Sequence, residues 1–335
     1  MRGPTYHANV TGRTSHGFDL QQTLYNVLMV RLRKTWLRPV ASLLFTGVLV
    51  FFVFQNWQKF GESLRVMRSV PLNEFFLSIP LLALTFLLAA FAYSFLAFRR
   101  LRLRELLVVE LAAAAINRLV PSGLGGLGVH GLYLHNRKHT TAQATAVVSI
   151  NNLLGMVIHL SLLAAILVTG TAGQFRLGWH FSQGWVLLGG ALVVGALLFV
   201  RPVRQKLKQF GHNLLVSLRR YERQPHKLAY AAMALLALTL IYLLILHLAA
   251  RSFGVWLGAP SLFLVYTAGV FVGAAVPTPG GLAGVEAGLV GGFMAYGVGS
   301  TTAIAIALAF RLVTYWLPIV PGLAALFYSR GHKLI

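Results

Sequence analysis

Long runs of apolar residues recur along the chain, and no other feature limits its fold as strongly. A run of about 20 apolar residues crosses the hydrocarbon core of a bilayer as a helix. The candidate spans are Ala41–Gln55 with its flanks, Glu74–Phe98, Thr141–Thr169, Gly184–Val200, Leu228–Ala250 and Ala303–Tyr328. Only 11% of the residues are charged and 57% are hydrophobic, whereas soluble domains have about 25% charged residues. The sequence therefore predicts an all-α polytopic membrane protein.

The basic residues gather in some connections between these runs and are scarce in others. Residues 1–40, 99–104, 137–138, 201–227 and 330–333 hold 22 Lys and Arg residues, against five in 56–73, 170–183 and 251–260. Short loops rich in Lys and Arg stay on the cytoplasmic side. We therefore predict a multi-pass protein of the cytoplasmic membrane with both termini in the cytoplasm. Because the basic residues flank apolar runs, the net charge of +22 favours anionic lipid headgroups over nucleic acid as partner.

Two basic segments are expected to lie outside the bilayer. Residues 1–35 are predicted to form a cytoplasmic arm, and they lack the short apolar core and small-residue site of a cleavable signal peptide. Residues 201–227 have apolar residues near helical spacing, which favours an amphipathic connector on the anionic leaflet. The alternative for this second segment is an ordinary positively charged loop.

Two segments rich in Pro and Gly interrupt the apolar sequence. They are "NRLVPSGLGGLG" (Asn117–Gly128) and "VPTPGGLAGVEAG" (Val276–Gly288), and Pro and Gly break helices. The distribution of basic residues requires 105–138 to start and end on the cytoplasmic side, and 256–300 to start and end on the other side. We therefore predict two re-entrant helical hairpins, one at 105–138 and one at 256–300, that enter from opposite faces.

The two halves of the chain resemble each other. "VPSGLGGLGVHG" matches the second broken segment at an offset of 155–156 residues, and "TTAQATAV" matches "TTAIAIAL" at 161. Since the matching spans run in opposite directions, we predict two inverted-topology repeats, 36–169 and 184–328. Inverted repeats with broken helices that meet near the bilayer midplane are typical of secondary transporters.

The broken segments are candidates for binding anions. A helix that restarts after a break exposes unpaired N–H groups and the positive end of its dipole, where phosphates and carboxylates bind. The residues in question are Pro121, Gly125, Gly126, Pro277, Pro279, Gly280 and Gly281. The alternative is that the glycines only let membrane helices pack closely.

Ionisable residues inside the apolar sequence are the sharper signal, because such groups are costly in a membrane. Glu286 is predicted to pair with Arg311, with Tyr315 one turn later on the same helix face. Either the pair locks two helices, or Arg311 contacts lipid phosphate while Glu286 titrates or gates. His130 occupies the place equivalent to Glu286 in the first repeat. It is either a proton relay or a hydrogen-bonded core residue.

Further polar residues could line the same cavity. They are Asn117, Arg118, Asn151 and Asn152. Glu110 either pairs with Arg118 or lies near the membrane interface. His159 and His247 are expected to be packed, hydrogen-bonded side chains. The chain has no cysteine, no metal-ligand spacing and no nucleotide motif, so we expect no metal and no cofactor.

The broken segments also resemble those of a known family. "PTPGGLAGVEAGLV" (Pro277–Val290) resembles the Pro-x-Pro-Gly-Gly-x-Gly-x-x-Glu signature of the lysylphosphatidylglycerol synthase transmembrane-domain family, with Ala283 in place of the third glycine. The first segment resembles the family's Asn-x-x-x-Pro motif, and Arg311 matches its basic position. Members often have Gly-Glu and Arg after the first proline, where Leu127–His130 stand here. The resemblance covers most of 40–328.

The family includes the flippase domain of the multiple peptide resistance factor and stand-alone membrane proteins. The resemblance therefore implies movement of anionic or aminoacylated phospholipids, or of polyprenyl- or glycan-linked lipids, between leaflets. Because only 329–335 follow the last predicted span, we expect no synthase activity and no enzyme. The alternatives are a scaffold that partners a lipid-modifying or envelope enzyme, an enzyme acting on lipid phosphates, and a solute transporter. A homo-oligomer is also left open.

Overall fold

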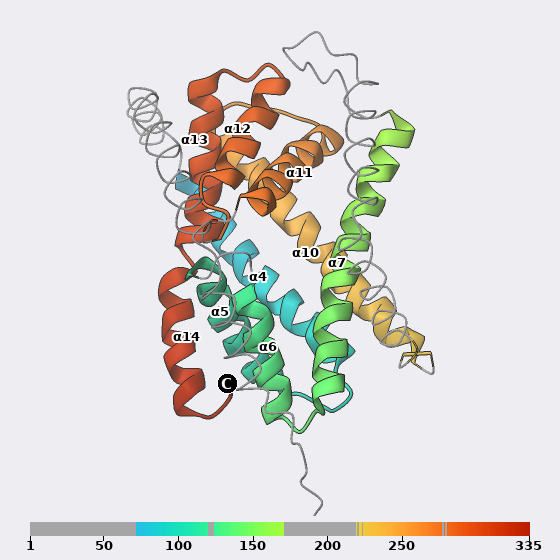
Figure 1. The fold of residues 1–335 in the computed structure, drawn as a ribbon. Helices are drawn as coiled ribbons and strands as arrows, with labels where there is room; N and C mark the ends of the chain where they lie inside the picture. Colours follow the sequence, from blue (N-terminus) through green and yellow to red (C-terminus); the bar gives the residue numbers. More distant parts are fainter. Residues whose placement is uncertain are drawn as a thin grey trace, which may run out of the picture. The chain divides into compact units, whose positions relative to one another are not determined.

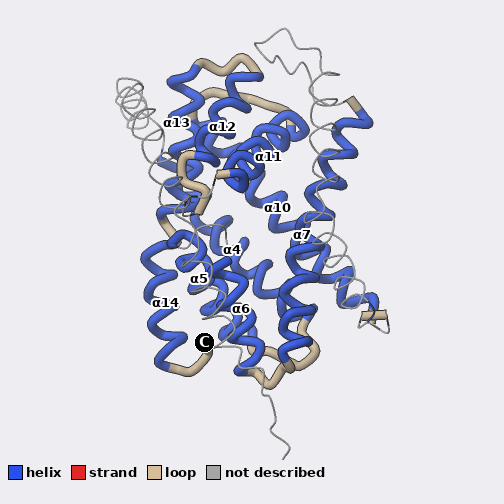
Figure 2. Tube along the Cα trace, viewed as in Figure 1, coloured by secondary structure: helices blue, strands red, loops and turns tan. Residues whose placement is uncertain are grey.

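The regular structure of the protein is helical wherever it is described. The computed structural model describes residues 72–119, 124–170, 219, 221–222, 224–276, 278 and 280–335, which lie within one compact unit, Phe52–Ile335 (Figures 1 and 2). The helices are α4 (Leu72–Leu96), α5 (Leu103–Leu119), α6 (Leu124–Asn136), α7 (Thr141–Thr169), α10 (Pro225–Ser252), α11 (Ala259–Ala275), α12 (Gly284–Ala295), α13 (Ser300–Arg311), the π-helical turn η1 (Leu312–Trp316) and α14 (Ile319–Gly331).

Four stretches in the described residues are long and apolar enough to cross a membrane. They are Phe76–Leu96, Thr141–Thr169, Pro225–Ser252 and Ser300–Gly331, which confirms four of the predicted spans as helices of sufficient length. The predicted arm 1–35, the spans 41–55 and 184–200, and most of the connector 201–227 lie outside the described residues. The described part of this membrane protein is thus all-helical and contains these four candidate spans.

Local sequence explains where α7 begins and ends. Thr140 and Gln143 form a capping box, since each side chain accepts a hydrogen bond from the other residue's backbone N–H, at 3.2 and 3.0 Å. Such a pair satisfies two of the N–H groups that a helix start leaves free. The helix ends at Gly170, whose φ of 64° is in the left-handed region that glycine adopts without strain.

The described connections that were predicted to be cytoplasmic meet at one end of this unit. The contacts that join them are Arg99 N–H to His139 Nε2 (3.3 Å), Lys227 Nζ to the Ala97 carbonyl (2.9 Å) and Asn136 Nδ2 to the Leu334 carbonyl (3.3 Å). At the other end, the Glu74 and Arg251 side chains lie 3.7 Å apart. Helices α4 and α10 are therefore antiparallel, as the basic residues predicted. Which end faces the cytoplasm stays a prediction.

Helices α5 and α6 form an antiparallel pair on either side of the first broken segment. At the base of the pair, Arg137 Nε lies 2.7 Å from Glu105 Oε2. At the tip, the Gly126 N–H donates to Asn117 Oδ1 at 2.6 Å. The predicted hairpin 105–138 is thus a helix–break–helix unit that starts and ends at the same end as the basic connections (Figure 1).

Helices α11 and α12 form the second antiparallel pair, around the other broken segment. They approach closely through glycines: a Cβ on Gly288 would collide with the Ala268 carbonyl, and one on Gly292 would lie 3.0 Å from the Val265 Cα. Tyr296, just beyond α12, interacts with Ser261 at the start of α11. The pair therefore starts and ends next to the Glu74–Arg251 end.

The last predicted span, 303–328, is interrupted in a way that the sequence analysis did not foresee. After α13 the backbone forms the π-helical turn η1, in which the Leu317 N–H donates to the Leu312 carbonyl at 3.0 Å. The physical cause is Pro318, which has no N–H to offer the Thr314 carbonyl four residues earlier. The turn leaves that carbonyl available to another partner.

His139, in the connection between α6 and α7, makes stability depend on pH. Its Nε2 accepts from the Arg99 N–H and its Nδ1 donates to the Leu134 carbonyl, an arrangement that needs the neutral imidazole. Burial lowers the pKa of His139 below its ordinary value. Protonation therefore favours the unfolded chain: stability is full above the unfolded pKa of about 6.5 and is lost as the pH falls from there towards the lowered folded pKa.

We expect acidification from about pH 7.5 to about pH 5 to lower the thermal midpoint in detergent, with a limiting slope of about 1.4 kcal/mol per pH unit for this group. His139→Gln should reduce that slope. The control is His135→Gln, because His135 is exposed. An unchanged slope in His139→Gln would show that His139 does not cause the pH dependence.

Candidate functional site

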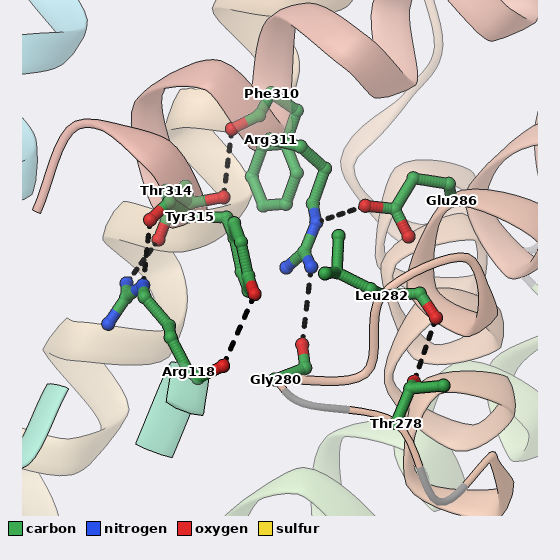
Figure 3. Close-up of polar contacts among 9 residues, drawn as sticks. All are labelled: Arg118, Thr278, Gly280, Leu282, Glu286, Phe310, Arg311, Thr314 and Tyr315. Carbon is green, nitrogen blue, oxygen red and sulfur yellow. Dashed lines mark hydrogen bonds and ion pairs between the residues drawn. The ribbon is translucent and has the colours of Figure 1, made fainter. Parts of the chain in front are cut away.

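The predicted pair of Glu286 and Arg311 forms between α12 and the end of α13 (Figure 3). Arg311, the last residue of α13, has its Nε 2.6 Å from Glu286 Oε1, and its Nη2 donates to the Gly280 carbonyl at 3.2 Å. Only 7% of Arg311 is exposed. A buried charge of this kind requires a partner of opposite sign and additional hydrogen bonds, and Arg311 has both.

Glu286 lies in the first turn of α12. A carboxylate there lies at the positive end of the helix dipole, so Glu286 faces two positive partners: the helix end and Arg311. Its second oxygen, Oε2, is buried without a hydrogen-bond partner among the described residues. A buried carboxylate oxygen with free lone pairs is ready to accept a hydrogen bond from a cationic group.

Tyr315, in η1, lies between the two arginines of the site. Its ring centre is 4.2 Å from the Arg311 guanidinium carbon and 5.6 Å from that of Arg118, distances at which cations are attracted to an aromatic face. The backbone of Gly280 packs against the same ring, and a Cβ there would collide with it. Gly280 also has a φ of 58°, so both space and backbone conformation favour glycine here.

Arg118, at the end of α5, is held by carbonyl groups. Its Nη1, Nη2 and Nε donate to the carbonyls of Ala114, Thr314 and Tyr315, at 2.5, 2.6 and 2.7 Å. Among the described residues no carboxylate pairs with it. The alternative of a Glu110–Arg118 pair is therefore wrong, because Glu110 pairs with His130 instead and the π-helical turn supplies Arg118 with a free carbonyl.

The charges of this centre do not cancel. Arg118 and Arg311 each carry a positive charge, and Glu286 carries the one negative charge among the described residues that contact them. In a low-dielectric environment a net positive charge attracts an anion strongly. The centre is built where α5, α12, α13 and η1 meet, and Tyr315 there contacts both Arg118 at the end of α5 and Gly280 before α12.

His130 and its neighbours form a second polar cluster, in the first half of the chain. His130 Nε2 lies 3.0 Å from Glu110 Oε1, and its ring stacks on Tyr93 with centroids 4.0 Å apart. Asn151 interacts with Tyr93, so it belongs to this cluster and not to the arginine centre. Asn152 is exposed and bonds to the Val148 carbonyl of its own helix, so the structure brings it to neither cluster.

The glycines of the broken segments serve close packing in several places. Cβ atoms on Gly125 and Gly126 would collide with Ile116 and Asn117, and one on Gly281 would lie 3.2 Å from the Gly273 carbonyl. Pro121, Pro277 and Pro279 lie outside the described residues.

Protein groups already occupy part of the predicted anion sites at the helix starts. Asn117 accepts from the Gly126 N–H near the start of α6, and the Gly281 carbonyl accepts from the Val285 N–H near the start of α12. The guanidinium groups are therefore stronger candidates for an anion site than the free helix ends.

The remaining histidines on the predicted spans, His159 and His247, pack against neighbouring side chains. His159 Nε2 lies 3.0 Å from Thr267 Oγ1, and the His247 ring meets the Trp256 ring edge-on at 5.9 Å, so both are packed side chains. The part of the chain that is described contains no group of three potential metal ligands.

The site also contains features that the sequence analysis missed. Neither Tyr93 nor the carbonyls that hold Arg118 were singled out. For the carbonyls a signal exists, because Pro318 lies four residues after Thr314 and therefore frees its carbonyl. Tyr93 has no such signal, since one tyrosine in an apolar run looks like any other.

These features define an α-helical multi-pass membrane protein whose charged centre lies where two broken helix pairs meet. The chain belongs to the lysylphosphatidylglycerol synthase TM region family, whose model matches residues 40–322. That range contains both broken segments and both polar clusters, so the membership covers the whole candidate site. No match was found among curated proteins.

Proposed function

We propose that this protein moves phospholipids with anionic or aminoacylated headgroups between the leaflets of the cytoplasmic membrane. The observation that carries the proposal is the net positive charge of the centre formed by Arg118, Arg311 and Glu286. Ionisable groups inside a membrane protein are costly to bury, so their presence there points to a functional role. A lipid phosphate is the anion that a membrane supplies in quantity.

The hydrogen-bonding groups of the centre suit such headgroups. The guanidinium groups bind phosphate oxygens through charge-assisted hydrogen bonds. Glu286 Oε2, which has no hydrogen-bond partner among the described residues, would accept from the ammonium group of an aminoacylated lipid. The family's description names lysylphosphatidylglycerol synthase, and lysylphosphatidylglycerol has both a phosphate and ammonium groups. Family and site chemistry therefore support the same class of lipid.

We also propose that the two helix pairs are re-entrant hairpins of two inverted repeats, 36–169 and 184–328. In support, the α5–α6 pair starts and ends at the end of the basic connections, whereas the α11–α12 pair starts and ends at the other. Rocking of one repeat against the other would open the centre to each leaflet in turn. The headgroup would pass through the polar centre while the acyl chains remain in lipid.

An Arg118→Gln variant of the protein, reconstituted in liposomes, tests the proposal. We expect wild type to exchange headgroup-labelled anionic lipids between leaflets faster than empty liposomes. Arg118→Gln should slow that exchange about tenfold or more, equivalent to about 1.4 kcal/mol of lost phosphate stabilisation. Glu286→Gln, which keeps an oxygen for Arg311, should slow aminoacylated lipids more than anionic ones.

The matched control is Arg251→Gln, because Arg251 is half exposed at the end of α10 and stacks on Trp256. Its exchange rates should equal those of wild type. If Arg118→Gln and wild type exchange lipid at equal rates, the arginine centre does not lie on the path of the lipid. If wild type is no faster than empty liposomes for anionic, aminoacylated and neutral lipids, the protein is not a translocase, and a scaffold for an envelope enzyme becomes the better interpretation.

A further inference from the structure

The pair of His130 and Glu110 is buried and lies apart from the arginine centre. His130 lies on α6 and Glu110 on α5, and only 6% and 8% of the two residues are exposed. The imidazole stacks on the Tyr93 ring of α4 at an interplanar angle of 6°, so three helices enclose it. The proposed passage of the headgroup does not use either residue.

The hydrogen bonds of His130 determine how many protons the pair holds. Nδ1 lies 2.7 Å from the Gly126 carbonyl, and since a carbonyl only accepts, Nδ1 must carry a hydrogen. Nε2 lies 3.0 Å from Glu110 Oε1, and that contact also needs one hydrogen, either on Nε2 or on the carboxyl group. Both arrangements contain the same single extra proton and leave the pair with no net charge.

Few other groups influence this proton in the described part of the chain. From α5, Glu110 is the charged group that acts on His130. From α4, the facing group is Tyr93, and α7 contributes Asn151 beside it, which does not titrate. The remaining contact of the imidazole is the Gly126 carbonyl of its own helix. The shared proton therefore belongs to His130 and Glu110 alone.

Loss of that proton would break the contact between α5 and α6. The Nε2 lone pair would then face a carboxylate, and two acceptors repel each other at 3.0 Å. The effect reaches the arginine centre through Gly126, whose carbonyl binds His130 and whose N–H binds Asn117. Asn117 directly precedes Arg118 in the chain, so a shift of α6 alters the position of the phosphate-binding arginine.

We propose that His130 and Glu110 form a proton-binding site that couples lipid movement to the proton gradient. The inference rests on the proposed function and adds its energy source. While the proton is bound, His130 and Glu110 hold α5 and α6 together. Release of the proton to water allows these two helices to move relative to each other. One proton would be bound and released in each cycle, with no other chemical change.

The substitution Glu110→Gln tests the role of the shared proton independently of the contact between α5 and α6. The glutamine amide donates to His130 Nε2, so the two helices stay joined without an exchangeable proton. The first measurement is a pH titration of ¹⁵N-histidine-labelled protein in lipid, from about pH 5 to about pH 9, with the His130 signal identified by its loss in His130→Asn. We expect this signal to change once with pH in wild type and to stay constant in Glu110→Gln. A wild-type signal that does not change would overturn the proton site.

The second measurement is the leaflet distribution of labelled lipid under an imposed pH gradient. A gradient of one pH unit is worth about 1.4 kcal/mol per proton, so coupling of one proton per lipid shifts the distribution up to about tenfold in wild type. Glu110→Gln should leave the leaflets equal. Glu105→Gln, which changes a carboxylate at the base of the same helix pair, should behave as wild type does.

The outcomes distinguish this inference from the proposed function. If wild type exchanges lipid but the pH gradient does not change the leaflet distribution, the coupling is wrong and translocation still holds. The same conclusion follows if Glu110→Gln accumulates labelled lipid in one leaflet under the gradient. If wild type exchanges no lipid, translocation and coupling both fail. The ¹⁵N titration would then still decide whether the pair binds a proton.

Discussion

Arg311→Ala is expected to destabilise the protein by about 3–5 kcal/mol, the cost of leaving one partner of a buried ion pair unpaired. The substitution removes the Nε contact with Glu286 at 2.6 Å, the hydrogen bond to the Gly280 carbonyl and the cation above the Tyr315 ring. The unpaired Glu286 carboxylate would remain in a setting where Arg311 itself is 7% exposed. Unfolding in mixed detergent micelles measures the loss.

A double variant separates the unpaired charge from lost packing. Adding Glu286→Gln to Arg311→Ala removes the uncompensated carboxylate, so we expect the double variant to recover about half of the loss or more. Arg251→Ala is the control, since its exposed pair with Glu74 is worth about 1 kcal/mol or less. If single and double variants are equally unstable, the carboxylate is not the source of the loss.

Gly288→Ala is expected to cost about 3 kcal/mol, at the upper end of overpacking effects. The added methyl group would collide with the Ala268 carbonyl and lie 2.8 Å from the Gly269 Cα. Both are backbone atoms, so no side-chain rotation relieves the contact, and α11 and α12 must move apart. Because Glu286 lies half a turn before Gly288 on α12, lipid exchange should fall together with stability.

Gly291→Ala is the matched control on the same helix. A Cβ there meets nothing within 4 Å, so the change should be neutral or stabilise the helix by up to about 1 kcal/mol. Equal stability of Gly288→Ala and wild type would show that the close approach of α11 and α12 is not needed for folding.

The spans and the central ion pair could be predicted from sequence because each follows from a strong energetic rule. A long apolar run has few alternatives to a membrane helix, and α4, α7 and α10 start and end within three residues of the predicted runs. A lone acid in an apolar sequence requires a base, and Arg311 was the basic residue in the following span. The prediction of Glu286–Arg311 therefore followed from the cost of burying charge.

The partners of Arg118 and Glu110 could not be predicted in the same way. Arg118 uses backbone carbonyls, and every residue has one, so the side-chain sequence does not single them out. Arg118 and His130 both lie close enough along the hairpin to be the ionic partner of Glu110. The packing of α5 against α6 brings His130, and not Arg118, to Glu110. Placement of a helix pair to within one turn depends on contacts between helices that single-sequence patterns do not record.

The carbonyl partners of Arg118 have a consequence for turnover. An arginine bound to a carboxylate must separate two full charges before it can take up a phosphate. In the proposed transport, Arg118 would instead exchange neutral dipoles at Thr314 and Tyr315 for the incoming anion. When the phosphate left, the same carbonyls would accept hydrogen bonds from the guanidinium again. Resting and loaded states can therefore lie close in free energy, which is the condition for a carrier that must release its cargo as readily as it binds it.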